Sequence, residues 1–251
     1  MRITGQEDIV EAMLDEPDEP VTVLSTQIVP DFPRSSTSSV VQKADSAVAS
    51  DAAICSHRLA ELSGTDQWKD WRWQMKNRIR SVEKLRELFP SFEEGSDFVA
   101  ASEKFPMAIT PYYASLIRRI DDGDPVFRMA MPQARELWSP FFLRNDPLEE
   151  ERNMPVPGLV HRYPDRILLI ATSVCAMYCR YCTRKRVTGM RESCISESRI
   201  GRTVEYLRNH PEIKDVVISG GDPLTMSTDT VVRILDALRS VKTVDVIRIG
   251  T

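Results

Sequence analysis

The chain has 251 residues, of which 42% are hydrophobic and 28% are charged, and its formal net charge is -4. This composition is typical of a globular protein with room for one large domain or two small ones. The small negative charge argues against nucleic acid as the main partner, and the lack of an 18-residue apolar run argues against a membrane partner. Acidic residues stand near the start, where a signal peptide would be apolar, so we expect a cytosolic protein.

Residues 1–60 are predicted to be a disordered tail, because an acidic opening leads into a stretch rich in Ser, Ala and Asp without apolar periodicity. From Asp66, which can cap a helix, apolar residues recur at steps of three and four. They predict one helix with a single apolar face (Trp68, Trp71, Met75, Ile79, Val82 and Leu85). Proline and glycine interrupt the helical stretches that follow, so we predict a small helical domain over residues 61–155.

Residues 156–251 alternate between strand and helix patterns. Short apolar runs predict buried strands at 166–172, 215–219 and 244–249, with a helix after Ser196 and another from Asp229. This order predicts a parallel sheet, and hence an α/β fold: a partial parallel (βα) barrel preceded by the helical domain and the tail. A complete barrel has about eight such units. We therefore expect this segment to be the first half of a barrel, truncated at the end of the chain.

Three of the five cysteines form a Cys-x3-Cys-x2-Cys array, Cys175, Cys179 and Cys182, directly after a predicted strand. In a reducing compartment such clustering indicates metal binding rather than disulfides. Three thiolates can hold three irons of a [4Fe-4S] cluster and leave the fourth iron open to a small molecule. A structural zinc site needs a fourth nearby ligand, yet His161 and Cys194 lie outside the array. Zinc and a purely structural iron–sulfur module stay as alternatives.

The array, with Tyr181 before its last cysteine, resembles the signature of the radical S-adenosylmethionine superfamily. A glycine-rich string at the end of the next predicted strand supports this resemblance (Ser219, Gly220, Gly221, Asp222 and Pro223). The resemblance implies that the open iron binds S-adenosylmethionine and that an electron from the cluster cleaves it to methionine and a 5′-deoxyadenosyl radical. It also implies that Tyr181 contacts the adenine and that the glycine-rich string binds the methionine part. Glycines there let the backbone approach a ligand closely.

Longer strings resemble lysine 2,3-aminomutase and its relatives (residues 68–74, 108–113, 155–166 and 182–186). This resemblance implies an isomerase that uses pyridoxal 5′-phosphate and converts an α-amino acid, lysine above all, to its β-isomer. Arg162, Tyr163 and Arg166 match positions around the cofactor phosphate, and Arg184 matches the arginine that pairs with the substrate carboxylate. Guanidinium suits both tasks because it makes bidentate contacts to oxyanions. Without the resemblance these arginines would be taken for surface charges.

The substrate stays open, because Tyr181 and Pro223 are more like some glutamate-acting or translation-factor-associated relatives. Glutamate, arginine or another substrate is an alternative, as is an inactive truncated iron–sulfur protein. The imine-forming lysine and the acids that bind a side chain are expected beyond residue 251, so we expect this chain alone to be inactive. The expected partners are a small-molecule amino acid and a reductant such as flavodoxin or ferredoxin, and the full-length protein is expected to be a homo-oligomer.

Overall fold

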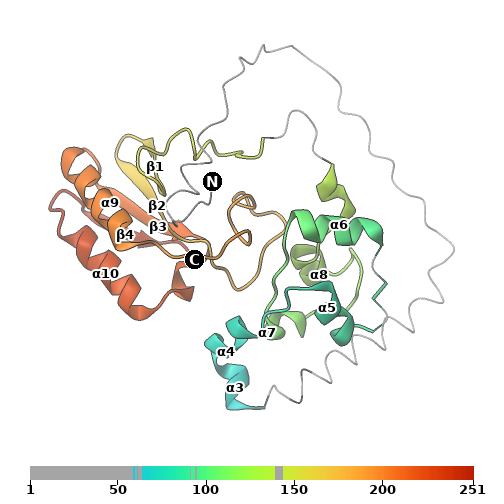
Figure 1. Cartoon of the computed structure of the whole chain (residues 1–251). Coiled ribbons are helices and arrows are strands. Elements are labelled where there is room, and N and C mark those ends of the chain that lie inside the picture. The colour runs from blue at the N-terminus through green and yellow to red at the C-terminus, as the bar shows by residue number, and fades with distance from the viewer. Residues whose placement is uncertain (1–58, 60, 62–63, 91, 94, 139–143) are drawn as a thin grey trace, which may run out of the picture.

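The computed structural model describes residues 59, 61, 64–90, 92–93, 95–138 and 144–251 (Figure 1). A helical part, residues 64–138, and a sheet part, residues 159–249, lie on either side of a loop that carries the clustered cysteines. The predicted disordered tail falls outside the described residues, except for Leu59, which is buried in the core of the helical part.

Short helices build the helical part: α3 (Asp66–Lys69), α4 (Trp71–Lys76), α5 (Val82–Leu88), α6 (Ser96–Lys104), α7 (Pro111–Ala114), α8 (Pro125–Ala130) and the 3-10 helix η1 (Ala134–Leu137). They pack around a core that includes Ile79, Leu85, Phe89, Ile109 and Met131. Among the described residues, no helix has both the length and the apolar character needed to cross a membrane.

The prediction of one continuous helix at the start of this part is wrong, because the segment forms α3, α4 and α5 instead. Thr65, Asp70 and Ser81 each accept a hydrogen bond from a backbone N–H and so begin a new helix. Between α4 and α5, the backbone of Ile79 pairs with Ile109 in a β-bridge, with N–H···O distances of 2.8 and 3.1 Å. Capping and this bridge override the apolar periodicity, and the first cap is the residue before the predicted one.

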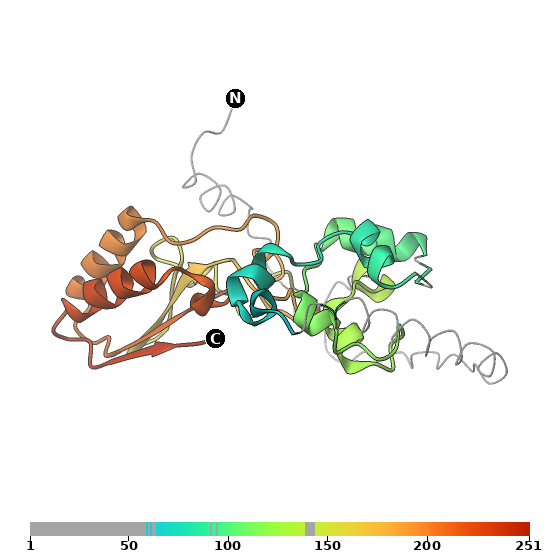
Figure 2. The same cartoon turned by 90° about the horizontal axis from the view of Figure 1, so that it is seen from below.

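The sheet part holds four strands in the order β1 (Leu159–Tyr163), β2 (Arg166–Thr172), β3 (Asp215–Gly220) and β4 (Val246–Ile249). Strands β2, β3 and β4 are parallel, as predicted, and β4 begins two residues later than expected. Helices α9 (Glu197–Asn209) and α10 (Thr228–Arg239) cover one face of the sheet (Figure 2). The predicted cap Ser196 is confirmed, since its hydroxyl accepts a hydrogen bond from the N–H of Arg199.

Strand β1 was not predicted, and it pairs antiparallel to β2. Its sequence lacks the apolar pattern that predicts a strand, because only Leu159 and Val160 are buried and the remaining residues are polar or exposed. The four-stranded sheet is mixed and it is not closed. The described residues therefore show an α/β sheet, and they do not show the predicted barrel.

Because β2 and β3 are parallel and in register, both end at the same edge of the sheet, where Thr172 lies opposite Gly220. The starts of the two strands, Arg166 and Asp215, pair at the opposite edge. The six residue steps along β2 separate these edges by about 20 Å, since a strand rises about 3.3 Å per residue. The short 3-10 helix η2 (Pro223–Thr225) follows β3 at the first edge.

Candidate functional site

The clustered cysteines lie on a loop, residues 173–195, that leaves the end of β2 and returns to α9. Backbone hydrogen bonds close its stem, from the N–H of Ser173 to the carbonyl of Ser193 (2.9 Å) and from the N–H of Ile195 to the carbonyl of Ala171 (2.7 Å). We call this segment the cysteine loop. Its closed stem fixes both ends of the loop at the edge where β2 and β3 end.

Cys175, Cys179 and Cys182 are all half-buried free thiols. Burial raises the pKa of Cys175 to about 12, and the neighbouring charges of Cys182, Asp222 and Cys179 act in the same direction. Burial also raises the pKa of Cys179. The thiols are therefore close enough to affect one another, and iron binding must displace their protons.

These thiols fit a four-iron cluster, because each thiolate then binds a different iron and the donors need not converge on one ion. Within the described residues, no three Cys, His, Asp or Glu side chains gather closely enough to hold a single metal ion. Cys194 lies at the base of the cysteine loop, exposed, with its Sγ 3.6 Å from Oγ1 of Thr172. The array thus offers three soft donors on one loop.

Tyr181, the predicted adenine contact, is 70% exposed on the cysteine loop. The charge of Cys179 and a side-chain hydrogen bond to that thiol raise the pKa of the Tyr181 hydroxyl. Its Oη also lies 3.9 Å from Sδ of Met129 in the helical part. The side chain therefore borders the cysteines, while its contact with an adenine stays a prediction.

The glycine-rich string lies where β3 ends and crosses the start of the cysteine loop. The N–H of Gly221 donates to the carbonyl of Thr172 (2.5 Å), and the N–H of Asp222 donates to the carbonyl of Val174 (2.7 Å). A Cβ on Gly220, which has a φ of 125°, would overlap the Thr172 carbonyl oxygen, and one on Gly221 would overlap that of Val174. The contacts on both glycines are thus with the backbone that leads into Cys175.

Ser219 and Asp222 flank these glycines and are half-buried. The Asp222 carboxylate accepts hydrogen bonds from the N–H of Leu224 (3.0 Å) and from the hydroxyl of Thr251 (2.6 Å). It therefore caps η2 while its charge acts on the Cys175 thiol. The structure brings the predicted S-adenosylmethionine residues to the cysteines.

Arg184, the predicted substrate arginine, also lies at this edge. Its Nη1 donates to the carbonyl of Gly220 (3.3 Å), and its backbone N–H lies 3.4 Å from Sγ of Cys182. Its guanidinium pairs with Glu150, whose Oε1 accepts from Nη2 (2.6 Å) and from Nε (2.9 Å). Sequence reasoning missed Glu150, because nothing marks this acid among its acidic neighbours. The arginine is already bound to a carboxylate, the group predicted for its substrate.

Arg162, Tyr163 and Arg166 lie at the other edge of the sheet, where β2 begins. This edge is about 20 Å along β2 from the edge at which the cysteine loop starts. Arg162 donates to the carbonyl of Leu148 (3.0 Å), and Tyr163 is 57% exposed. Arg166 donates to the carboxylate of Asp215 (2.7 Å). The structure does not bring these residues to the cysteines, and their role at a cofactor phosphate stays a prediction.

A buried ion pair, also missed from sequence, fastens the cysteine loop to the helical part. Arg180, between two of the cysteines, donates from Nε (3.0 Å) and Nη2 (2.7 Å) to Glu136, and their side chains are 7% and 9% exposed. Its Nη1 donates to the carbonyl of Pro106 (3.0 Å). Burial opposes ionisation of Glu136, yet hydrogen bonds from Arg180 and Lys185 outweigh it and lower the pKa of this carboxyl.

Comparison with known proteins identifies relatives of this chain. Residues 165–249, which include the cysteine loop and β2 to β4, match the model of the 4Fe-4S single cluster domain. L-lysine 2,3-aminomutase of Clostridium subterminale is 46% identical over 192 residues, which cover 76% of this chain and 46% of the relative. This chain is a homologue of the L-lysine 2,3-aminomutases. The resemblance to this family of radical S-adenosylmethionine enzymes is confirmed.

Other aminomutases match over the same share of the chain. L-lysine 2,3-aminomutase of Bacillus subtilis is 40% identical over 187 residues, which cover 74% of this chain and 40% of the relative. Glutamate 2,3-aminomutase of Clostridioides difficile is 36% identical over 195 residues, which cover 77% of this chain and 46% of the relative. The chain therefore spans less than half the length of these aminomutases.

Proposed function

We propose that the cysteine loop binds a [4Fe-4S] cluster through Cys175, Cys179 and Cys182, and that S-adenosylmethionine binds at the fourth iron. The observation that carries this proposal is the half-buried array at the edge where β2 and β3 end, directly beside Gly220 and Asp222. When bound, the cluster supplies one electron that breaks the carbon–sulfur bond of S-adenosylmethionine, which gives methionine and a radical able to take hydrogen from a substrate.

The residues of the chain position these groups. The thiolates bind three irons, and their half-burial limits access of water to the cluster. The backbone at the glycine-rich string holds the cysteine loop against β3 through two hydrogen bonds of 2.5 and 2.7 Å. Arg184 offers a guanidinium at the same edge, and a substrate carboxylate would bind it in place of Glu150 or beside it.

At the level of the whole protein, we propose an amino-acid 2,3-aminomutase that uses pyridoxal phosphate and a low-potential reductant such as flavodoxin or ferredoxin. The names of the relatives support lysine as the substrate. Glutamate is the second candidate, because a glutamate 2,3-aminomutase is 36% identical to this chain.

Anaerobic reconstitution of the protein that carries these residues tests the cluster. We expect four irons per chain and their loss in Cys175→Ala, Cys179→Ala or Cys182→Ala. Cys194→Ala is the matched control, because this thiol is exposed at the base of the loop. If Cys194→Ala lost iron as fully as the others, the open-iron proposal would be wrong.

A second experiment tests the activity. The reconstituted protein is incubated with S-adenosylmethionine, pyridoxal phosphate and dithionite, separately with lysine, glutamate and arginine. We expect 5′-deoxyadenosine and a β-amino acid from one of these substrates, measured by chiral chromatography. Cleavage of S-adenosylmethionine without any β-amino acid would contradict the aminomutase proposal and leave the cluster proposal standing.

A further inference from the structure

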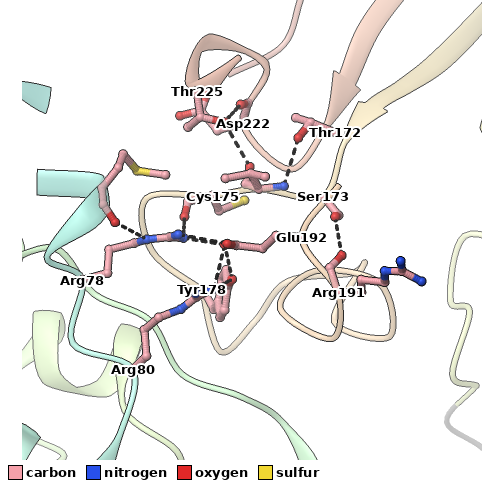
Figure 3. A network of polar contacts seen from close by, with 12 residues as sticks. Arg78, Arg80, Thr172, Ser173, Cys175, Tyr178, Arg191, Glu192, Asp222 and Thr225 are labelled. Atoms are coloured by element: carbon pink, nitrogen blue, oxygen red, sulfur yellow. Dashed lines mark hydrogen bonds and ion pairs between the residues drawn. The ribbon is translucent and has the colours of Figure 1, made fainter. Parts of the chain in front are cut away.

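Arg78, between α4 and α5, reaches across to the cysteine loop. Its Nη1 donates to the carbonyl of Cys175 (2.6 Å), and Nη1 and Nη2 donate to the two carboxylate oxygens of Glu192 (2.6 and 3.1 Å) (Figure 3). Its Nε donates to the carbonyl of Met75 at the end of α4 (2.9 Å). One guanidinium thus links the helical part to both ends of the cysteine loop, the outgoing end at Cys175 and the returning end at Glu192.

This contact is specific to arginine. The Arg78 side chain is only 7% exposed, and a buried guanidinium is stable only where its donors are paired. Its planar fork binds both oxygens of one carboxylate while a nitrogen also donates to a carbonyl, which a lysine ammonium cannot do with the same geometry. The contact joins residues 97 positions apart in the sequence.

Glu192, the acid that pairs with Arg78, also contacts two further side chains. It accepts a hydrogen bond from the hydroxyl of Tyr178 (2.5 Å), and Nη2 of Arg80 lies 2.9 Å from the same oxygen (Figure 3). Burial opposes ionisation of Glu192, but hydrogen bonds from Arg78 and Tyr178 and the two arginine charges outweigh it and lower its pKa to about 2. Glu192 is therefore charged at neutral pH, and it fixes Tyr178, which lies between two of the cysteines.

We propose that Arg78 is a positioning residue for the cluster, and that the charges of Arg78 and Glu192 set the reduction potential of the cluster in opposite directions. This inference rests on the cluster site proposed above. Reduction adds one negative charge to the cluster, so a nearby cation favours the reduced state and a nearby anion opposes it. The hydrogen bond from Arg78 to the Cys175 carbonyl also holds a ligand-bearing peptide in place.

The test is a redox titration of the reconstituted protein, in which electron paramagnetic resonance measures the reduced cluster at each potential. We expect Arg78→Gln to lower the midpoint potential and Glu192→Gln to raise it. Arg80→Gln is the matched control, because Arg80 shares Glu192 and Tyr178 but is 47% exposed and has no hydrogen bond to Cys175. Its shift should be smaller than that of Arg78→Gln. Shifts of the first two variants in the same direction, or an equal shift in the control, would overturn the electrostatic role.

A measurement on the iron-free protein tests positioning without the cluster. Hydrogen–deuterium exchange of the cysteine loop is measured by mass spectrometry, with helix α9 as an internal reference. Loss of a hydrogen bond from a charged donor should speed backbone exchange in the loop by about tenfold in Arg78→Gln, and Arg78→Lys should restore part of the protection. An unchanged exchange rate in the loop would overturn the positioning role. Wild-type protein that takes up no iron would instead count against the cluster site itself.

Discussion

Replacing Gly221 with alanine should destabilise the protein and the cysteine loop together. The added Cβ would overlap the Val174 carbonyl oxygen and lie 2.9 Å from the carbonyl carbon of Ser173. Unstrained carbon atoms approach to about 3.5 Å, so the backbone before Cys175 must shift by at least about 0.6 Å. From sequence alone, a larger residue here is expected to remove S-adenosylmethionine binding and spare the cluster; the structure predicts loss of both.

The magnitude follows from the contacts that the shift breaks. Two backbone hydrogen bonds, from Gly221 to Thr172 and from Asp222 to Val174, contribute about 0.5–1.5 kcal/mol each, and overpacking costs about 1–3 kcal/mol. We therefore expect the free energy of unfolding of Gly221→Ala to fall by about 2–6 kcal/mol. Urea unfolding measures this loss, and iron analysis after reconstitution measures the cluster.

Gly201→Ala is the matched control, because Gly201 lies in α9 and an added Cβ there meets nothing within 4 Å. This variant should gain about 0.5–1 kcal/mol from the higher helix propensity of alanine. If Gly221→Ala bound a full complement of iron and unfolded like the wild type but failed to bind S-adenosylmethionine, the glycine would serve the ligand alone. The backbone argument would then be refuted.

Three further predictions concern charged residues. Glu136→Gln should lose about 3–5 kcal/mol in urea unfolding, because it leaves the buried Arg180 without its anion; a loss below about 1 kcal/mol would contradict this. Glu192, whose pKa is lowered from 4.5 to about 2, should stabilise the protein fully above pH 4.5 and progressively less as the pH falls toward 2. The stability difference between wild type and Glu192→Gln should shrink over that range; a constant difference would count against the pairing. Arg166→Ala, at the far edge of the sheet, should leave iron uptake unchanged, and iron loss would place this residue at the cluster.

The α/β half of the fold could be predicted from sequence because local pattern and tertiary role agree there. In β2 one face of the apolar run is buried and the other is half-buried, and in α9 the residues at helical spacing face the sheet (Ile200, Val204 and Leu207). Strand β1 could not be predicted, because its pairing with β2 buries only its first two residues. The prediction of one helix at the start of the helical part was wrong for a related reason. Side-chain caps at Asp70 and Ser81 divide an apolar pattern that looks continuous from its periodicity alone.

Some residues of the candidate site could be predicted from the sequence and others could not. The cysteine spacing and the glycine-rich string are local signals, and the structure brings both to one edge of the sheet. Arg78, Glu136 and Glu192 carry no such signal, because each looks like an ordinary surface charge until its partner is known. These partners lie 44 to 114 residues away in the sequence. A single sequence gives no means of pairing charges over that distance.

The cysteine loop depends on the helical part for its shape. The loop contains no helix or strand. Some of its backbone N–H groups bond within the loop, as that of Cys182 does to the carbonyl of Cys179 (3.0 Å), and others need partners outside it. The N–H of Tyr178 donates to the carbonyl of Ala108 (3.0 Å), and the N–H of Arg180 donates to the carbonyl of Met129 (2.8 Å). Both acceptors belong to the helical part. The spacing of the cysteines therefore decides which atoms can bind iron, whereas the folding of the helical part decides whether those atoms are held where a cluster can form.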